Sequence, residues 1–428
     1  MQTTQTGPEL DPKLPPPFLP LTFSLFRHQP FVRFWLGRIF TSMANNMLAV
    51  AVGWQMYDLT HSAMDLGYVG LVQFAPALLF TLLVGHVADR YDRRMIVTAC
   101  LTLQAVVIGV LIASTQHHWI SRDLILLCSF VIGTAKAFQM PTTQALAPML
   151  VPADVLPRAL ALSSSGAQFA IIVGPAFGGF LYASGANTVY ALCGVLTVIA
   201  AICFVMVRIE YQAPPREPVT LTSVFAGLDF IWHRKAVLGA ISLDLFAVLL
   251  GGATALLPIY ARDILLIGPL GLGLLRSAPA VGALSISIWL ARNPIQRKVG
   301  KVMFAAVATY GVATLVFAFS KLFLLSLVAL VVSGAADMIS VVIRQSLVQL
   351  DTPNEMRGRV SAVNSIFIGA SNQLGEFESG LTAAWWGAIA SVAVGGIGTL
   401  VVVAAWMRHF PELTRRERLV QEQESASR

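Results

Sequence analysis

A small set of ionisable residues interrupts otherwise apolar stretches of this sequence. They are Lys136, Asp244, Asp337, Arg344, Glu376 and Glu378. A charged side chain in apolar surroundings is costly unless it faces water or a partner, so such residues often mark pathways for solutes, ions or protons. We therefore take this set as the candidates for binding a transported substrate and for coupling its movement to protons.

Lys136 and Asp337 occupy equivalent positions in an internal repeat. A shift of 201 residues places Gln144 on Gln345 without a gap, and further pairs follow: Gly133/Gly334, Leu146/Leu347, Pro152/Pro353, Arg158/Arg359, Gly174/Gly375 and Gly179/Gly380. The same shift places Lys136 on Asp337. In one interpretation both line a central cavity, and Asp337 is a substrate or proton site. In the other they form ion pairs that fix helix packing and bind nothing.

The remaining acids differ in their surroundings. Glu376 and Glu378 are separated by about 200° around a helix, so they cannot both face one cavity. Glu376 shares its side with Asn372 and Gln373 and is the preferred cavity-facing residue. Either glutamate is also close enough to a span end to reach water. Asp244 has apolar neighbours at helical spacing, which favours a neutral carboxyl that could carry a proton.

The composition identifies the surroundings of these residues as a membrane. Hydrophobic residues make up 56% of the 428-residue chain and charged residues 12%, with a mean hydropathy of +0.72. A soluble chain of this length could not bury so much apolar surface. Together with the repeat, this predicts an all-α integral membrane protein with twelve transmembrane helices in two six-helix pseudo-symmetric bundles, an arrangement that occurs in secondary transporters.

Twelve segments have the roughly 20 apolar residues that crossing a bilayer requires. They are 34–57, 66–88, 95–114, 124–146, 159–183, 187–207, 236–260, 270–291, 302–320, 322–343, 360–382 and 386–407. Every third segment contains no ionisable residue and is expected to face lipid. The predicted organisation is a tail over 1–33, a bundle over 34–207, a linker over 208–235, a bundle over 236–407 and a tail over 408–428.

Basic residues predict the orientation of the chain. If both termini are cytoplasmic, cytoplasmic segments hold 23 of the 29 Lys and Arg residues when Arg38, near the cytoplasmic start of the first span, is counted with them, and external loops hold Arg122, Arg262 and Lys321. This distribution follows the positive-inside rule. The net charge of +7 therefore reports topology and gives no indication of nucleic-acid binding.

The loop after the second segment reads Gly85-His86-Val87-Ala88-Asp89-Arg90-Tyr91-Asp92-Arg93-Arg94. It resembles the loop 2–3 signature of the major facilitator superfamily, Gly-x-x-x-Asp-Arg-x-Gly-Arg-Arg, with Asp92 in place of the second glycine. The resemblance implies a conformational latch in which the acid holds the start of helix eleven. Its residues would be Gly85, Asp89, Arg90, Arg93, Arg94, Arg357 and Arg359. The alternative is an ordinary basic cytoplasmic loop.

The fifth and first predicted spans contain residues that we expect to shape the transport path. The fifth contains Gly174, Pro175, Gly178 and Gly179, similar to the helix-five pattern of antiporters and exporters of the superfamily, and this favours a pliable, closely packed helix. The first is unusually polar and is expected to line the path with Arg38, Asn45, Asn46 and Gln55. The superfamily's proton-linked arginine motif on helix four is missing, and Lys136 stands near its place.

The segments 26–38 and 352–380 look like the exporter subfamily that includes the bacterial enterobactin exporter. This resemblance spans nearly all of 26–407. It implies a monomeric transporter of the bacterial inner membrane that works by alternating access and exchanges protons for a small organic molecule, such as a siderophore or a drug. A lysophospholipid flippase or an uptake symporter on the same fold remains an alternative, as does a sensor or scaffold that transports nothing.

The sequence gives no indication of enzyme activity. It contains no metal-like spacing of Cys and His and no phosphate-binding Gly-x-x-x-x-Gly-Lys motif. We therefore expect no metal, no cofactor and no direct use of ATP. The four cysteines all fall in apolar segments and are expected to be reduced packing residues.

Overall fold

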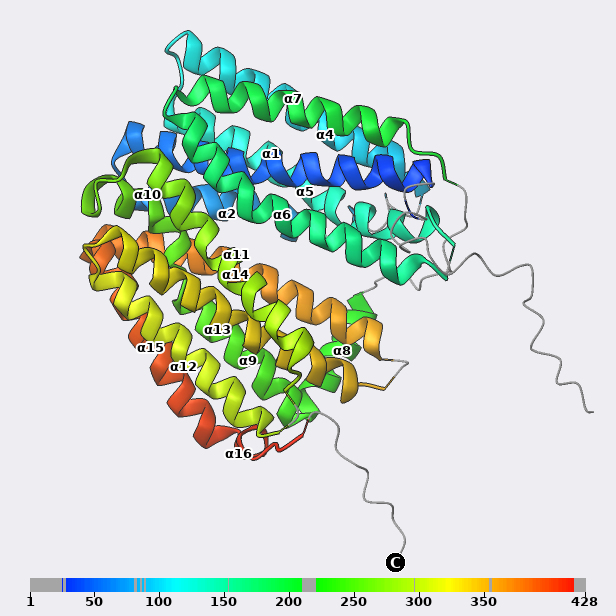
Figure 1. Cartoon of the computed structure of the whole chain (residues 1–428), viewed down its shortest axis with the longest axis vertical. Coiled ribbons are helices and arrows are strands. Elements are labelled where there is room, and N and C mark those ends of the chain that lie inside the picture. The colour runs from blue at the N-terminus through cyan, green and yellow to red at the C-terminus, as the bar shows by residue number, and fades with distance from the viewer. Residues whose placement is uncertain are drawn as a thin grey trace, which may run out of the picture.

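Long helices in two layers make up the part of the chain that the structure describes (Figure 1). This computed structural model describes Leu25 and residues 28–80, 83–84, 87, 90–152, 154–209, 221–295, 297–353 and 356–418. The first layer contains α1 (Gln29–Thr60), α2 (Ala63–Leu79), α4 (Arg93–Gln116), α5 (Arg122–Leu146), α6 (Leu156–Tyr182) and α7 (Ala186–Val205). The second contains α9 (Lys235–Leu250), α11 (Gly268–Arg292), α12 (Val299–Phe319), α13 (Phe323–Leu350), α14 (Arg357–Trp386) and α15 (Ala388–His409).

Short elements complete the two layers. The helix α9 is continued by η3 (Ala253–Leu256), α10 (Leu257–Ile259) and η4 (Tyr260–Ile264), and η2 (Ala147–Met149) follows α5. The predicted linker contains a helix of its own, α8 (Leu221–His233), which packs on α14. The helix α16 (Pro411–Thr414) lies beyond α15, within the predicted tail.

The two layers repeat one packing plan. In the first, α1 packs on α6 and α7, α2 on α5, and α4 on α5 and α7. In the second, α9 packs on α14 and α15, α11 on α13, and α12 on α13 and α15. These are the same pairs when the helices of each layer are counted in order. The predicted pair of pseudo-symmetric six-helix bundles is therefore confirmed, and we call the layers the N-terminal and C-terminal halves.

Hydropathy identifies fewer spans than the fold contains. Nine helices among the described residues are long and apolar enough to cross a membrane, and α1, α2 and α14 are not among them. The described part of α2 has only 17 residues, whereas α1 and α14 carry many polar side chains. The same three helices contribute most of the polar lining of the cavity described below. In α1 and α14 these polar residues lower the hydropathy by which a membrane span is recognised.

The helices α4, α7, α12 and α15 lie at the outer edges of the two layers (Figure 1). They expose large apolar side chains such as Val106, Ile202, Val312 and Val401. An exposed apolar surface of this kind is stable in contact with lipid. These helices correspond to every third predicted span, which contains no ionisable residue and is expected to face lipid, and their exposed apolar side chains fit that expectation.

The halves meet along two helix pairs, α2 with α14 and α6 with α11. A Cβ on Gly380 would lie 2.7 Å from the Cα of Gly67, and one on Gly273 would lie 2.4 Å from the carbonyl oxygen of Pro175. The ribbons of the two halves converge at the end that carries α10 and diverge toward the end that carries α8 (Figure 1). We call the first the closed end; it includes Gly67, Gly273 and Gly380.

Gly133 and Gly334, which are equivalent in the repeat, lie at equivalent helix crossings. A Cβ on Gly133 would lie 2.2 Å from the carbonyl oxygen of Gln73, and one on Gly334 would lie 2.0 Å from that of Pro279. Both distances are far inside van der Waals contact with a rigid backbone. Each half therefore requires a residue without a side chain at this crossing.

Replacing either glycine by alanine is expected to push two helices apart. Overpacking of this kind costs about 1–3 kcal/mol, so Gly133→Ala and Gly334→Ala should each lower the thermal unfolding temperature of the purified protein in detergent. The matched control is Gly109→Ala on α4, where a Cβ would meet nothing within 4 Å, and which should be neutral or slightly stabilising. Equal unfolding temperatures for all three variants would contradict this interpretation of the repeat.

Candidate substrate-binding site

A cavity of about 300 Å³ lies between the two halves. Both halves contribute to its wall, and the polar or charged side chains there are Asn45, Asn46, Gln73, Lys136, Arg276, Gln373 and Glu376. They come from α1, α2, α5, α11 and α14. Polar groups that converge from separate helices on an enclosed space are the usual form of a small-molecule site.

Three charged side chains face this cavity: Lys136, Arg276 and Glu376. The Nζ of Lys136 donates to Oε1 of Gln73 over 3.4 Å, and Nη1 of Arg276 donates to the carbonyl oxygen of Ala49 over 3.4 Å. Glu376 interacts electrostatically with both cations. Between described residues, however, none of the three forms an ion pair within 4.0 Å. Their charges are thus gathered around the cavity but are not neutralised by direct pairing.

A second cavity of about 310 Å³ adjoins the first, and both are lined by Asn45 and Lys136. Its wall is formed by the N-terminal half alone and extends along α1 to Arg38, away from the closed end. The guanidinium of Arg38 donates to Oγ of Ser163 over 2.7 Å. Lys136 therefore stands at the junction of the two cavities.

Of the four polar residues of the first span that are predicted to line the path, three line one or both of these cavities: Arg38, Asn45 and Asn46. Gln55 lies elsewhere. It is 6% exposed, donates to Oγ1 of Thr115 over 3.1 Å and accepts a hydrogen bond from the hydroxyl of Tyr190 over 2.5 Å. These contacts join α1 to α4 and α7, because Gln55 points into the N-terminal half.

A second group of charges lies within the C-terminal half. Arg344 on α13 donates to Asp244 on α9, and both side chains are buried. Asp337 on α13 interacts electrostatically with both of them. The nearby Tyr310 on α12 donates its hydroxyl proton to the carbonyl oxygen of Gly251 over 3.0 Å. The group contains two carboxyls and one guanidinium, so its charges balance only when one carboxyl is protonated.

The structure places Lys136 and Asp337 in these separate groups, although they are equivalent in the repeat. Asp337 is not among the residues that line either of the two cavities. Asp244 has a charged partner in Arg344 that its neighbours in the sequence do not reveal, because the pair joins two helices. Glu378 is half-buried and lines neither cavity, whereas Glu376 lines the first.

Arg276 was not among the predicted site residues. It lies on α11, and its neighbours in the sequence are mostly apolar. The signal that could have identified it is the same as for Lys136: an unaccompanied cation inside a predicted span. Its position opposite Lys136 follows only from the packing of α11 against the N-terminal half.

An ion pair and a hydrogen bond join the two halves at the closed end. Arg262 of η4 forms an ion pair with Asp58 of α1, and the hydroxyl of Tyr57 donates to Asp263. The guanidinium of Arg262 also lies 6.0 Å from the centre of the Tyr57 ring. These contacts add charge complementarity to the close approach of Gly67 and Gly380.

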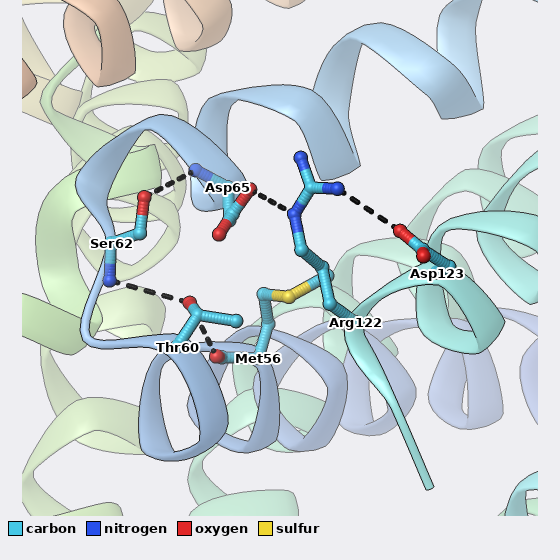
Figure 2. Close-up of polar contacts among 6 residues, drawn as sticks. All are labelled: Met56, Thr60, Ser62, Asp65, Arg122 and Asp123. Atoms are coloured by element: carbon cyan, nitrogen blue, oxygen red, sulfur yellow. Dashed lines mark hydrogen bonds and ion pairs between the residues drawn. The ribbon is translucent and has the colours of Figure 1, made fainter.

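A second polar cluster orders the turn between α1 and α2 on the same side of the molecule. Figure 2 shows Arg122 paired with Asp65 over 2.6 Å and with Asp123 over 3.0 Å. The hydroxyl of Ser62 accepts a hydrogen bond from the backbone N–H of Asp65 over 3.3 Å, which caps the start of α2. Thr60 accepts a hydrogen bond from the N–H of Ser62 over 3.3 Å. The short connection between the two helices is thereby held in one conformation.

The predicted latch is only partly described. Gly85 and Asp89 lie outside the described residues, so the contact expected between Asp89 and the start of helix eleven stays a prediction. Arg90 is exposed. Arg357 donates to the carbonyl oxygen of Gln349 over 3.0 Å and so holds the turn between α13 and α14. Arg359 is half-buried on α14.

Asp92, which departs from the superfamily signature, has a definite role in the loop. It accepts a hydrogen bond from the backbone N–H of Arg94 over 2.9 Å and caps α4. The side chain of Arg94 also pairs with it over 2.5 Å, and this hydrogen bond lowers the pKa of Asp92. Arg94 further donates to the carbonyl oxygen of Val207, and Arg93 to that of Ala145. These contacts lie within the N-terminal half.

The glycine-rich motif of the fifth span lies where α6 packs closely. A Cβ on Gly178 would lie 3.0 Å from the Cα of Met47 on α1, and one on Gly179 would lie 2.3 Å from the carbonyl oxygen of Pro269 on α11. Pro175 lies inside the helix, which runs without a break over the motif. The motif therefore allows α6 to contact both its own half and the other half.

Two pseudo-symmetric six-helix halves around a polar cavity define a membrane transporter of the major facilitator superfamily. Residues 21–425 match the family described as transmembrane secretion effector, and the chain belongs to that family. It is therefore a transporter and not an enzyme.

Two kinds of relative are similar to this chain in sequence. The chain is 25% identical over 405 residues to the enterobactin exporter EntS of Escherichia coli K12, covering 91% of this chain and 95% of that protein. It is 26% identical over 246 residues to macrolide efflux protein A of Streptococcus pyogenes; this match covers 54% of this chain and 59% of that protein, so it spans little more than half of that relative.

Solved structures share the fold at low sequence identity. A bacterial homologue of the human lysosomal transporter Spinster superposes with a TM-score of 0.70 at 13% identity, covering 91% of this chain and 98% of the other. The nucleoside transporter NupG gives a TM-score of 0.69 at 14% identity, covering 89% of this chain and 100% of the other. At such low identity, these similarities establish the fold alone.

Removal of one partner from the Asp244–Arg344 pair should destabilise the C-terminal half. A buried charge left without its partner costs about 3–5 kcal/mol, so Arg344→Gln should strongly lower the unfolding temperature in detergent. The double variant Asp244→Asn/Arg344→Gln removes both charges and should recover part of the loss. If the double variant were as unstable as the sum of the two single variants, the pair would not be coupled in the way that the geometry indicates.

Proposed function

We propose that this protein is a secondary active transporter of the bacterial inner membrane that exports a small organic molecule in exchange for protons. The observation that carries the proposal is the cavity lined by both halves, with the Arg262–Asp58 ion pair and the closest contacts between the halves gathered at one end. Such a site becomes accessible from either side when the halves rock against each other. The printed functions of EntS and macrolide efflux protein A support export.

In this proposal the closed end is external and both termini are cytoplasmic. The closed end carries few basic side chains, among them Arg122 and Arg262, whereas the starts of α4 and α14 at the other end carry Arg93, Arg94 and Arg357. Positive charge of this kind is retained on the cytoplasmic side. The conformation described here would then receive a substrate from the cytoplasm, with a monomer sufficient for transport.

The group formed by Asp244, Asp337 and Arg344 is the candidate for proton coupling. Arg344 pairs directly with Asp244, which leaves Asp337 as the carboxyl most readily protonated and released. A change of its charge would act on α13, which packs against α11, the helix that carries Arg276 at the cavity. Protonation of Asp337 and substrate binding at Arg276 would thus be coupled through the contact between α13 and α11. Asp89 would act separately, as a latch on the conformational equilibrium.

A second candidate function, flipping of a lysophospholipid, is favoured by one observation. An apolar recess of about 450 Å³ lies along α6 and α11, where the halves meet, and is lined by residues such as Phe177, Phe180, Leu274, Val281 and Leu327. A recess of this kind could hold a single acyl chain. Competition by lysophospholipids for transport in vesicles would distinguish a flippase from an exporter of soluble molecules.

A cross-link across the closed end should stop transport. The rings of Tyr68 on α2 and Phe377 on α14 are 5.8 Å apart between centres, so Tyr68→Cys/Phe377→Cys in a background without native cysteines should react with a short bifunctional thiol reagent. The locked protein could not open this end, and flux of a siderophore, macrolide or dye should fall to the level of empty vesicles. Each single-cysteine variant treated with the reagent is the control. Undiminished flux in the cross-linked protein would rule out alternating access at this end.

Asp337→Asn should uncouple transport from the proton gradient, because an amide cannot bind and release a proton at this position. The measurement is substrate-driven proton movement in vesicles with an imposed pH gradient, for the same panel of substrates. Asp123→Asn at an exposed position is the matched control, and it should behave as the unaltered protein. Proton movement that persists in the Asp337 variant would place coupling elsewhere and leave the buried group a structural one.

A further inference from the structure

We propose that the cavity between the halves selects substrates that carry an anionic group, which Lys136 and Arg276 bind together. This inference rests on the proposed transport function and names the substrate class for the same site. It follows from the charges that line the cavity, from the absence of ion pairs among them between described residues, and from the route by which the cavity is approached.

The charges around the cavity do not balance. Its wall contains two cations, Lys136 and Arg276, and one carboxylate, Glu376. The other polar side chains of the wall are the amides of Asn45, Asn46, Gln73 and Gln373, which carry no charge. The wall therefore carries an excess of one positive charge. In a site surrounded by protein and lipid such an excess is costly, because little water is present to solvate it.

A single anionic group of the substrate would remove this excess. The planar guanidinium of Arg276 can hold two oxygens of a carboxylate or phosphate, while Lys136 supplies a compact charge. The two side chains come from opposite halves, on α11 and α5 respectively. An anion between them would therefore link the halves, as a substrate that promotes a conformational change must do.

Glu376 sets the strength of this binding. It interacts electrostatically with the same two cations and lies against Gly70, where a Cβ would be 2.7 Å from its Oε2. Glu376 thus competes with the substrate for Lys136 and Arg276 and prevents the anion from binding too tightly to be released. Removal of its charge should strengthen the binding of an anion, which is the opposite of what general damage to the site would do.

The approach to the cavity carries the same sign of charge. Among the residues that the structure describes, the adjoining cavity is lined by Arg38 and Lys136 and by no acidic side chain. A passage lined by one sign of charge raises the local concentration of ligands of opposite sign. This second observation shares Lys136 with the site and adds the cation Arg38, and it favours the same class of substrate.

The test uses two xanthene dyes of similar shape and opposite charge: fluorescein, which is anionic, and rhodamine 123, which is cationic. Saturable binding is measured with the purified full-length protein, and flux is measured in vesicles with a pH gradient. We expect the protein to prefer fluorescein. Lys136→Gln and Arg276→Gln should each weaken fluorescein binding by roughly tenfold to a hundredfold, the range for losing a charged hydrogen-bond partner. Glu376→Gln should strengthen it.

The control is Lys321→Gln, which removes one positive charge from an exposed position away from the cavity and should leave dye binding unchanged. Tighter fluorescein binding by the Glu376 variant cannot arise from misfolding. A preference for rhodamine 123, or fluorescein binding that is absent or insensitive to Lys136 and Arg276, would overturn the anionic substrate class. Fluorescein binding that depends on both cations but is never followed by flux would support the site and contradict the exporter.

Discussion

Lipid cannot solvate an ionised side chain, so each charge between the membrane-spanning helices of this protein must be compensated by water, by a dipole or by another charge. The two groups of buried charge meet this requirement in different ways. In the C-terminal half, Arg344 is paired directly with Asp244. At the interface of the halves, Lys136, Arg276 and Glu376 surround a cavity and form no ion pair with another described residue. The paired charges in the C-terminal half suit a site that binds and releases a proton. The charges around the cavity suit a site that binds a charged ligand.

Glycine contacts connect these two groups mechanically. A Cβ on Gly334 would overlap the backbone of α11 near Pro279, and one on Gly282 of α11 would lie 1.9 Å from the carbonyl oxygen of Val331 on α13. The two helices are therefore in backbone contact over several residues. The helix α13 carries Asp337 and Arg344, two of the three residues proposed for proton coupling, and α11 carries Arg276. A small displacement of one helix cannot be absorbed by flexible side chains at such a contact, so it must move the other.

The closed end combines close packing with a partly exposed ion pair between the halves. Contacts between small residues bring α2 against α14 and α6 against α11, while Arg262 and Asp58 meet nearer the surface. Partly exposed ion pairs contribute little stability, and their exchange for water costs little when the halves separate. The contacts at the closed end can therefore define one packing of the two halves and still be broken at low cost, as alternating access requires.

Much of the architecture could be predicted from the sequence, because it follows from repeated, local signals. The 201-residue repeat and the apolar segments determine two six-helix halves, and the absence of charge in every third segment determines which helices face lipid. Lys136 and Glu376 were identifiable as site candidates because a charge in a span is conspicuous by itself. The partners of these residues were not identifiable: the repeat aligned Lys136 with Asp337, but the folded chain surrounds Lys136 with Arg276 and Glu376, and Asp337 with Asp244 and Arg344.

The sequence by itself thus determined the two sets of six long helices, the exposure of every third one to lipid and the places where charge enters the membrane, because each of these depends on the free energy of transferring local segments into lipid. Only the tertiary structure decided which charges share a cavity, that Gln55 points into the N-terminal half, and that one end of the molecule is closed. These features depend on contacts between helices far apart in the chain. No local property of a helix specifies the residue that a distant helix will place opposite it.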